Sequence, residues 1–148
     1  MKNKHFQIQK SQIESLVLDG DLASEFDGQP DIRFLLHNGN SKVEDFCFFH
    51  CVFPPGAAHV RHTHPNAAEF LYIIRGCAAA GTEDEEHEAP AGTAIFSPKD
   101  AVHWIRNLSD TEDLEFVGGY SGAAGLDTAG YNSVSKITEK YRQVPKKS

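Results

Sequence analysis

The chain has 148 residues, with 14 basic and 21 acidic side chains and a formal net charge of −7. This length is typical of one domain with a sizeable core, and an acidic chain without a basic patch is not expected to bind nucleic acid. No apolar run approaches the roughly 20 residues that a membrane-spanning helix needs, and the first ten residues lack the apolar stretch of a secretory signal. We therefore expect a cytoplasmic protein that does not bind membranes.

Short apolar runs separated by turn residues predict an all-β fold along most of the chain. Residues 1–30 contain scattered Gly, Pro and Asp, and we expect an arm there that packs across the core or between subunits. Residues 31–37 and 45–53 are predicted strands. The second is apolar on both faces, which is typical of a strand that is covered on both sides or lies at a subunit interface.

Two of the three cysteines, Cys47 and Cys51, lie on this second strand. In an extended chain their Cα atoms are about 13 Å apart, which exceeds the roughly 7 Å that a disulfide allows. Together with Cys77 they are predicted to be reduced and to serve as small buried hydrophobic residues.

Residues 56–76 carry the first group of candidate metal ligands. His62 and His64 are two residues apart, so on a strand they point to the same face and can share a small cation. Pro65 begins a predicted turn, because proline cannot donate to a strand ladder. The chain then enters an apolar, β-rich run with Glu69 at its start, which returns a carboxylate to the same depth.

Side-chain alternation predicts which neighbours face this group. Glu69 and Leu71 should point to the interior with the metal, whereas Tyr72 should point outward and is therefore disfavoured as a catalytic acid. His59 lies three residues before His62, so it should point to the opposite face. We do not expect it to be a ligand.

A second stretch, residues 92–107, supplies His103 on another short β-like run. Three histidines and one glutamate form a nitrogen and oxygen ligand set that suits Mn, Fe, Co, Ni, Cu or Zn and suits Ca or Mg poorly. Octahedral coordination by His62, His64, Glu69 and His103 would leave two positions open for water, substrate or dioxygen.

The remaining segments give weaker signals. The acidic run 83–88 is interpreted as a solvated hairpin tip, because its charges share no common face. Residues 121–131 are rich in glycine and are expected to fold over a mouth or an interface. The tail, residues 133–148, is predicted to form a short helix before Pro145 and then to fray.

The two ligand-bearing stretches resemble the two sequence motifs of the cupin superfamily. The first motif is glycine, five residues, His-x-His, four residues, Glu, six residues and glycine, and residues 56–76 fill it without a gap. The second is glycine, five residues, Pro-x-Gly, two residues, His, three residues and Asn, and residues 92–107 fit it except that Asp100 stands where the family has glycine. Aspartate tolerates turns and left-handed backbone better than most residues, so the ligand set is expected to stay intact. The resemblance covers about residues 46–120, and the wording HTHPNAAE is similar to germins and oxalate decarboxylases.

This resemblance implies one cupin domain over residues 1–148, and the single pair of motifs makes it a monocupin. The expected fold is a double-stranded β-helix, a small antiparallel jelly-roll barrel, at about residues 31–120. It would carry an N-terminal arm at 1–30 and an irregular C-terminal segment and tail at 121–148. We expect a homodimer, which the apolar strand at 46–53 would permit.

The resemblance also implies that His62, His64, Glu69 and His103 bind the metal. The favoured function is an enzyme that uses one divalent metal, Mn or Fe by preference, for oxidoreductase or decarboxylase/lyase chemistry on a small organic acid. No separate catalytic acid or base can be assigned from the sequence. Two alternatives remain: a cupin that binds a small molecule or sugar without turnover, and a sugar-phosphate isomerase, which would need basic residues to meet phosphate.

Overall fold

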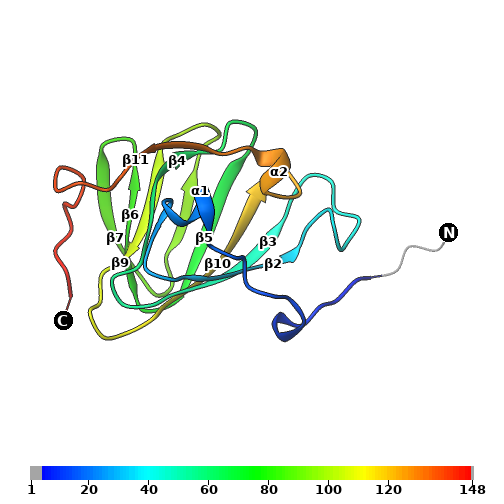
Figure 1. Ribbon diagram of the computed structural model, residues 1–148, viewed down its shortest axis with the longest axis horizontal. Coiled ribbons are helices and arrows are strands. Elements are labelled where there is room, and N and C mark those ends of the chain that lie inside the picture. Colours follow the sequence, from blue (N-terminus) through cyan, green and yellow to red (C-terminus); the bar gives the residue numbers. More distant parts are fainter. Residues whose placement is uncertain (1–4, 148) are drawn as a thin grey trace.

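The computed structural model describes residues 5–147, which are built almost entirely from antiparallel β-strands (Figure 1). No helix in this part of the chain is long and apolar enough to cross a membrane. In chain order the elements are η1 (Lys10–Gln12), α1 (Gly20–Ala23), β1 (Phe26–Asp27), β2 (Asp31–Leu36), β3 (Phe48–Phe53), β4 (Ala58–Thr63), β5 (Ala68–Arg75), β6 (Cys77–Thr82), β7 (Glu85–Pro90), β8 (Ala94–Ser97), β9 (His103–Asn107), β10 (Leu114–Ser121), α2 (Leu126–Ala129) and β11 (Asn132–Ser135).

The strands form two sheets. Sheet A has the order β1-β4-β9-β6-β7, with β11 also paired to β4, and sheet B has the order β2-β3-β10-β5-β8. From β3 to β6 and from β7 to β10, each strand lies in the other sheet from the strand before it, which is the connectivity of a double-stranded β-helix. The predicted all-β jelly-roll fold is confirmed. Figure 1 shows one barrel-like body, with the N-terminal arm in blue and the C-terminal tail in red extending from opposite ends.

Alternation along β5 separates the core from the surface. Leu71 and Ile73 are buried, whereas Phe70, Tyr72 and Ile74 are 40%, 49% and 44% exposed. The face assignment from the sequence is therefore confirmed for this strand. The side of β5 that carries Glu69 therefore faces the interior of the barrel.

The N-terminal arm packs on the barrel. β1 pairs with β4, and the backbone N–H of Leu16 donates to the carbonyl of Ile32 at 2.7 Å. Arg33 reaches back to this arm and donates to the carbonyl of Ile13 at 2.7 Å. This arginine also pairs with Asp31 and does not face the interior.

The predicted helix in the tail is wrong for the residues that the structure describes there. Residues 132–135 form β11 on the edge of β4, and the chain then runs without helix to residue 147. The apolar side chains of this segment are buried more fully than in a solvated helix. Ile137 is buried against Trp104 and Ala58, and Tyr141 packs beside them. Tertiary contacts have overridden a weak local preference.

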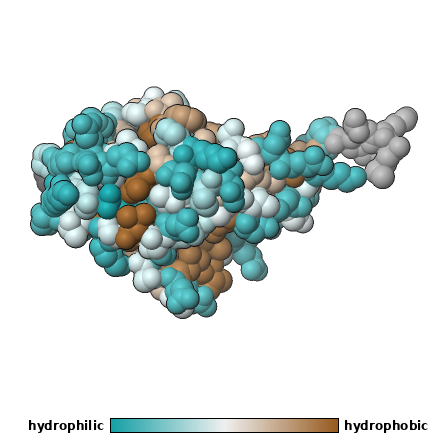
Figure 2. Space-filling model, turned by 90° about the horizontal axis from the view of Figure 1, so that it is seen from above, coloured by the Kyte–Doolittle hydropathy of each residue, from teal (hydrophilic) through white to brown (hydrophobic). Residues whose placement is uncertain are grey.

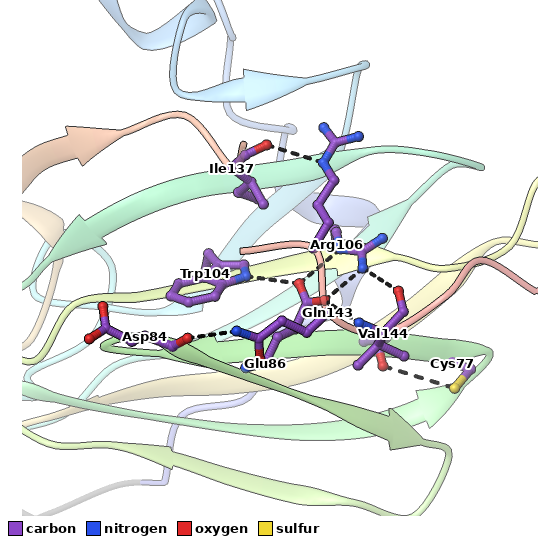
Figure 3. A network of polar contacts seen from close by, with 10 residues as sticks. Cys77, Asp84, Glu86, Trp104, Arg106, Ile137, Gln143 and Val144 are labelled. Atoms are coloured by element: carbon purple, nitrogen blue, oxygen red, sulfur yellow. Dashed lines mark hydrogen bonds and ion pairs between the residues drawn. The ribbon is translucent and has the colours of Figure 1, made fainter. Parts of the chain in front are cut away.

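The interpretation of residues 83–88 as a solvated tip is wrong for Glu86. Only Glu83 and Asp84 lie in the turn, and β7 begins at Glu85. The Glu86 side chain is fully buried and accepts hydrogen bonds from Arg106 at 2.6 Å and from the Trp104 indole at 3.0 Å (Figure 3). Arg106 also donates to the carbonyl of Val144, so a buried ion pair fastens the tail to sheet A.

Hydrogen bonding decides the charge state of Glu86. Burial alone raises the pKa of this carboxyl, but the hydrogen bonds from Arg106, the Val144 N–H and Trp104 outweigh burial and leave the pKa below its ordinary value. A carboxylate with a lowered folded-state pKa stabilises the fold above its unfolded pKa of about 4.3. That stabilisation is lost as the pH falls through the folded-state pKa.

We predict that Glu86→Ala lowers the free energy of unfolding by roughly 3 kcal/mol at pH 7, because it leaves a buried guanidinium without its partner. Glu85→Ala is the matched control: its carboxylate is 76% exposed and pairs with the exposed His87, so the change should stay within about 0.5 kcal/mol. Urea denaturation measures both. Equal effects of the two substitutions would contradict a structural role for the buried pair.

Large apolar side chains gather on the outer face of sheet B. Phe46, Phe70, Tyr72, Ile74 and Phe96 are all at least 40% exposed, and Phe70 pairs directly with Phe96 across β5 and β8. Figure 2 shows hydrophobic patches on a surface that is otherwise mostly hydrophilic. The predicted homodimer, with its contact at the apolar strand 46–53, stays a prediction; the exposed side chains on β5 and β8 offer a second candidate surface on the same sheet.

We predict that Phe96→Glu shifts the protein toward monomer if this face forms the contact, because the substitution puts a charge into an apolar interface. Light scattering of size-fractionated protein measures the mass. Val17→Glu, an exposed apolar position on the arm, should leave the mass unchanged. A dimer that persists in the Phe96 variant would rule out this face.

Candidate metal centre

Both sheets contribute to the predicted ligand group. His62 lies on β4, His64 follows directly after that strand, and His103 begins β9, so all three come from sheet A or its end. His62 and His103 are direct cross-strand partners, which places their side chains side by side. Glu69 stands on β5 of sheet B and faces them from the opposite wall.

The four side chains converge on one point. Their ligand atoms all lie within 4.8 Å of one another. The Glu69 carboxylate is 3.3 Å from His64 Nε2 and 3.4 Å from His103 Nε2. The structure therefore brings together the four residues that the sequence singled out, and this cluster could hold one metal ion.

Backbone carbonyls orient the three imidazoles. Nδ1 of His62 donates to the Val60 carbonyl at 2.6 Å, that of His64 to the Gly130 carbonyl at 2.8 Å, and that of His103 to the Ala101 carbonyl at 2.9 Å. A carbonyl oxygen can only accept, so each Nδ1 must carry the proton. Each Nε2 atom is then directed at the centre, where it is buried without a hydrogen-bond partner. Buried nitrogen atoms in this state are what a metal ligand requires.

The electrostatics keep Glu69 ionised. Burial raises the pKa of Glu69, but the neighbouring His103 and His64 rings outweigh burial and hold the pKa well below its usual range. Burial lowers the pKa of His62 well below its usual value, so this ring is neutral at pH 7. A carboxylate and neutral imidazoles are the protonation states in which these groups bind metals.

His59 corrects the face assignment from the sequence. The pairing of β4 with β9 is irregular between His59 and His62, and the extra residue of such a bulge resets the alternation. His59 therefore lines the interior, and its ring stacks on that of His62 at 3.9 Å. It is not among the four side chains whose ligand atoms converge, so the expectation that it is no ligand stays a prediction.

Tyr131 is a residue that the sequence reasoning missed. Its hydroxyl lies 3.0 Å from His59 Nε2, and its ring stacks near His62. It lies between α2 and β11, in the glycine-rich segment that was expected to fold over a mouth, and the only sequence signal was that position. Burial, followed by the nearby Glu25 carboxylate, raises the pKa of the Tyr131 hydroxyl, so it keeps its proton at neutral pH.

A cavity of ≈ 70 Å³ adjoins the four ligands between the two sheets. Its walls are mostly aromatic and aliphatic side chains of the barrel. Leu16 and Leu22 of the arm and Leu126 of the C-terminal segment also line it. The two segments outside the barrel strands thus complete the enclosure around the site.

Comparison with known proteins agrees with this geometry. The profile of the family described as Cupin domain matches residues 49–118. The match spans just under half of the chain and includes all four converging residues. The crystal structure of a cupin-like protein from Thermotoga maritima superposes with a TM-score of 0.68 at 23% identity, covering 81% of this chain and 87% of that chain. At this identity the likeness shows the shared fold.

The relatives in sequence include an enzyme and a plant protein. Oxalate decarboxylase of Arthroderma benhamiae is 37% identical over 68 residues, which cover 43% of this chain and 16% of that protein. Germin-like protein 9-3 of Oryza sativa subsp. japonica is 30% identical over 80 residues, covering 51% of this chain and 37% of that protein. The matches thus span well under half the length of these relatives.

The one departure from the cupin motifs leaves the site in place. Asp100, where the motif has glycine, adopts a left-handed backbone with φ 63°. Its N–H donates to the carbonyl of His64 at 3.0 Å, which ties the second motif to the first. Aspartate is among the few residues that reach this conformation at low cost, so the tolerance expected from the sequence is met at this turn.

We predict that His103→Ala removes most of the bound metal from protein that otherwise carries close to one divalent ion per chain, because it deletes one of four converging donors. Elemental analysis of untagged protein measures the stoichiometry. His87→Ala, which removes an exposed imidazole, should change nothing, and His59→Ala should also keep the metal. Full metal content in the His103 variant would overturn the assigned site.

Proposed function

We propose that this cupin domain is a mononuclear metal enzyme that acts on a small organic acid by oxidoreductase or decarboxylase/lyase chemistry. His62, His64, Glu69 and His103 would hold one divalent transition metal, with Mn or Fe favoured. The oxalate decarboxylase relative supports this class of reaction, although it shares only part of its length with the chain.

One observation carries the proposal. Three buried Nε2 atoms point at the same carboxylate and have no hydrogen-bond partner, while each Nδ1 is fixed by a backbone carbonyl. Leaving such buried atoms unsatisfied is costly, roughly 1–3 kcal/mol for each one. An arrangement that persists without hydrogen-bond partners is best explained by a metal that satisfies all three.

When bound, the metal would supply Lewis acidity and a template for substrate oxygen atoms. The chain's own residues supply the rest of the environment. The carbonyls behind His62, His64 and His103 hold the rings in orientation, and Glu69 offsets part of the cation's charge. The apolar walls exclude water from the cavity, which strengthens each electrostatic contact inside it.

The His59–Tyr131 pair is the candidate for proton exchange with a substrate. Among the cavity-lining residues that the structure describes, these two form a hydrogen-bonded pair outside the ligand set. The pKa of His59 lies well below its usual value, mainly because of burial. A protonated phenol next to a neutral imidazole can donate a hydrogen bond or a proton to a substrate oxygen. Tyr131 would then be the catalytic acid, a role for which the two motifs provide no residue.

The sugar-phosphate isomerase alternative loses support. A phosphate group calls for arginine or lysine at the site, and no described residue of either type lines the cavity. The binding protein without turnover remains the competing function. A binding protein would release its ligand chemically unchanged, whereas an enzyme would convert it, and this difference can be measured.

The test combines metal analysis with assays of turnover. Protein with close to one Mn or Fe per chain is expected to consume oxygen or release CO₂ when screened against small mono- and dicarboxylic acids. His103→Ala should abolish this activity. Protein that holds its metal and binds acids without converting any of them would support the non-catalytic alternative instead.

We predict that Tyr131→Phe lowers kcat by about 10²-fold, the lower range for loss of a general acid, while metal content stays at the wild-type level. Tyr72→Phe is the matched control, because its hydroxyl lies on the exposed outer face of β5. Steady-state kinetics on the substrate found in the screen measures both. An unchanged kcat in the Tyr131 variant would remove this pair from the mechanism.

A further inference from the structure

We propose that the centre selects a singly charged, oxygen-chelating acid with a short apolar tail, of which the 2-oxo monocarboxylates are the simplest, and that it disfavours a dianion such as oxalate. This inference rests on the proposed function, because it needs a metal at the four ligands. It names the class of acid, which the ligand set alone leaves open.

The walls of the cavity are the first reason. Apart from the four ligands, they consist mainly of aromatic and aliphatic side chains from both sheets, among them Phe34, Phe49, Phe53, Leu71, Ile95 and Phe116. In the described part of the chain, the polar groups on these walls are uncharged, such as Ser97, Tyr120 and the His59–Tyr131 pair. Such walls stabilise a hydrocarbon group of a ligand. They do not stabilise a second ionic group that lies away from the metal.

The positions of the barrel arginines are the second reason. Arg33 bonds to Asp31 and to the N-terminal arm. Arg61 donates to Ser135 and stacks on Tyr141 at 3.8 Å. All these contacts lie outside the cavity lining, so neither guanidinium is available to a second carboxylate.

The other two arginines of the barrel, Arg75 and Arg106, also bind groups outside the cavity lining. Arg106 forms the buried pair with Glu86 on the outer side of sheet A. Arg75 is 53% exposed at the end of β5, near Asp113 and Glu115. Among the described lining residues, Glu69 is therefore the only carboxylate, and none is an arginine or a lysine.

The charge balance follows from these placements. A divalent ion with one carboxylate and neutral imidazoles carries a net charge of about +1. A monoanion that binds through two oxygen atoms neutralises it, and the cavity is then uncharged. A dianion leaves a net negative charge in apolar surroundings without a compensating cation, which is strongly unfavourable.

The size of the cavity limits the tail. A water molecule needs roughly 10–15 Å³ in the same measure of volume, so ≈ 70 Å³ admits a chain of a few carbon atoms beside the chelating group. Each methylene that enters the apolar space should tighten binding roughly fourfold. The gain should end once the tail reaches Leu16, Leu22 and Leu126 at the enclosing segments.

The experiment is calorimetric titration of metal-loaded, full-length protein with oxalate, pyruvate, 2-oxobutanoate and 2-oxopentanoate. Pyruvate matches oxalate in shape, with a methyl group in place of one charged oxygen. In water, oxalate chelates a divalent ion more strongly than a 2-oxo monocarboxylate does. The inference therefore requires the protein to reverse this order of affinities. We expect 2-oxobutanoate to bind at least tenfold more tightly than oxalate, with affinity rising along the series.

Several results would overturn the inference: tighter binding of oxalate, affinity that does not change with tail length, or no binding of any of the four acids. Metal content is measured first. Protein that takes up no metal would count against the proposed function. Metal-loaded protein with a different order of affinities for the four acids would count against this inference alone. A variant gives a second readout. Ile95→Arg, on the short strand β8, should raise oxalate affinity at least tenfold, whereas Ile95→Met should leave the order of the four acids unchanged.

Discussion

Three hydrogen bonds from imidazole to backbone orient the side chains of the candidate metal centre. Each fixes a proton on Nδ1 and turns Nε2 toward a shared point, where Glu69 waits on the opposite sheet. The carbonyls belong to Val60, Ala101 and Gly130, so two acceptors sit within two residues of their histidine and the third comes from the C-terminal segment. The ligand set therefore depends on the barrel and on a segment that returns to it.

The rest of the architecture serves this arrangement. Antiparallel pairing of β4 with β9 places His62 beside His103, and β5 carries the carboxylate on the other sheet. The arm and the C-terminal segment then close an apolar cavity in front of the ligands, while the tail is fastened on the far side of sheet A by the pair of Glu86 and Arg106 (Figure 3). Arginine side chains bind the tail and the N-terminal arm to the barrel. None of the described residues that line the cavity is an arginine or a lysine.

Local rules predicted most of the barrel and all four converging residues. Period-two alternation placed Glu69 inside and Tyr72 outside, and the tolerance of aspartate for left-handed backbone anticipated the turn at Asp100. The failures share a cause, since each depends on contacts between distant segments. The bulge that turns His59 inward arises in the pairing with β9, the burial of Glu86 requires the tail to come back over β7, and the missing tail helix reflects the place that Ile137 finds against Trp104.

The most direct test of the central claim is anomalous diffraction at the absorption edge of the bound metal, from crystals of the protein purified without added metal. The account predicts a single strong peak among His62, His64, Glu69 and His103, within bonding distance of the three Nε2 atoms. A map with no peak at this point, or a peak held by other residues, would contradict it.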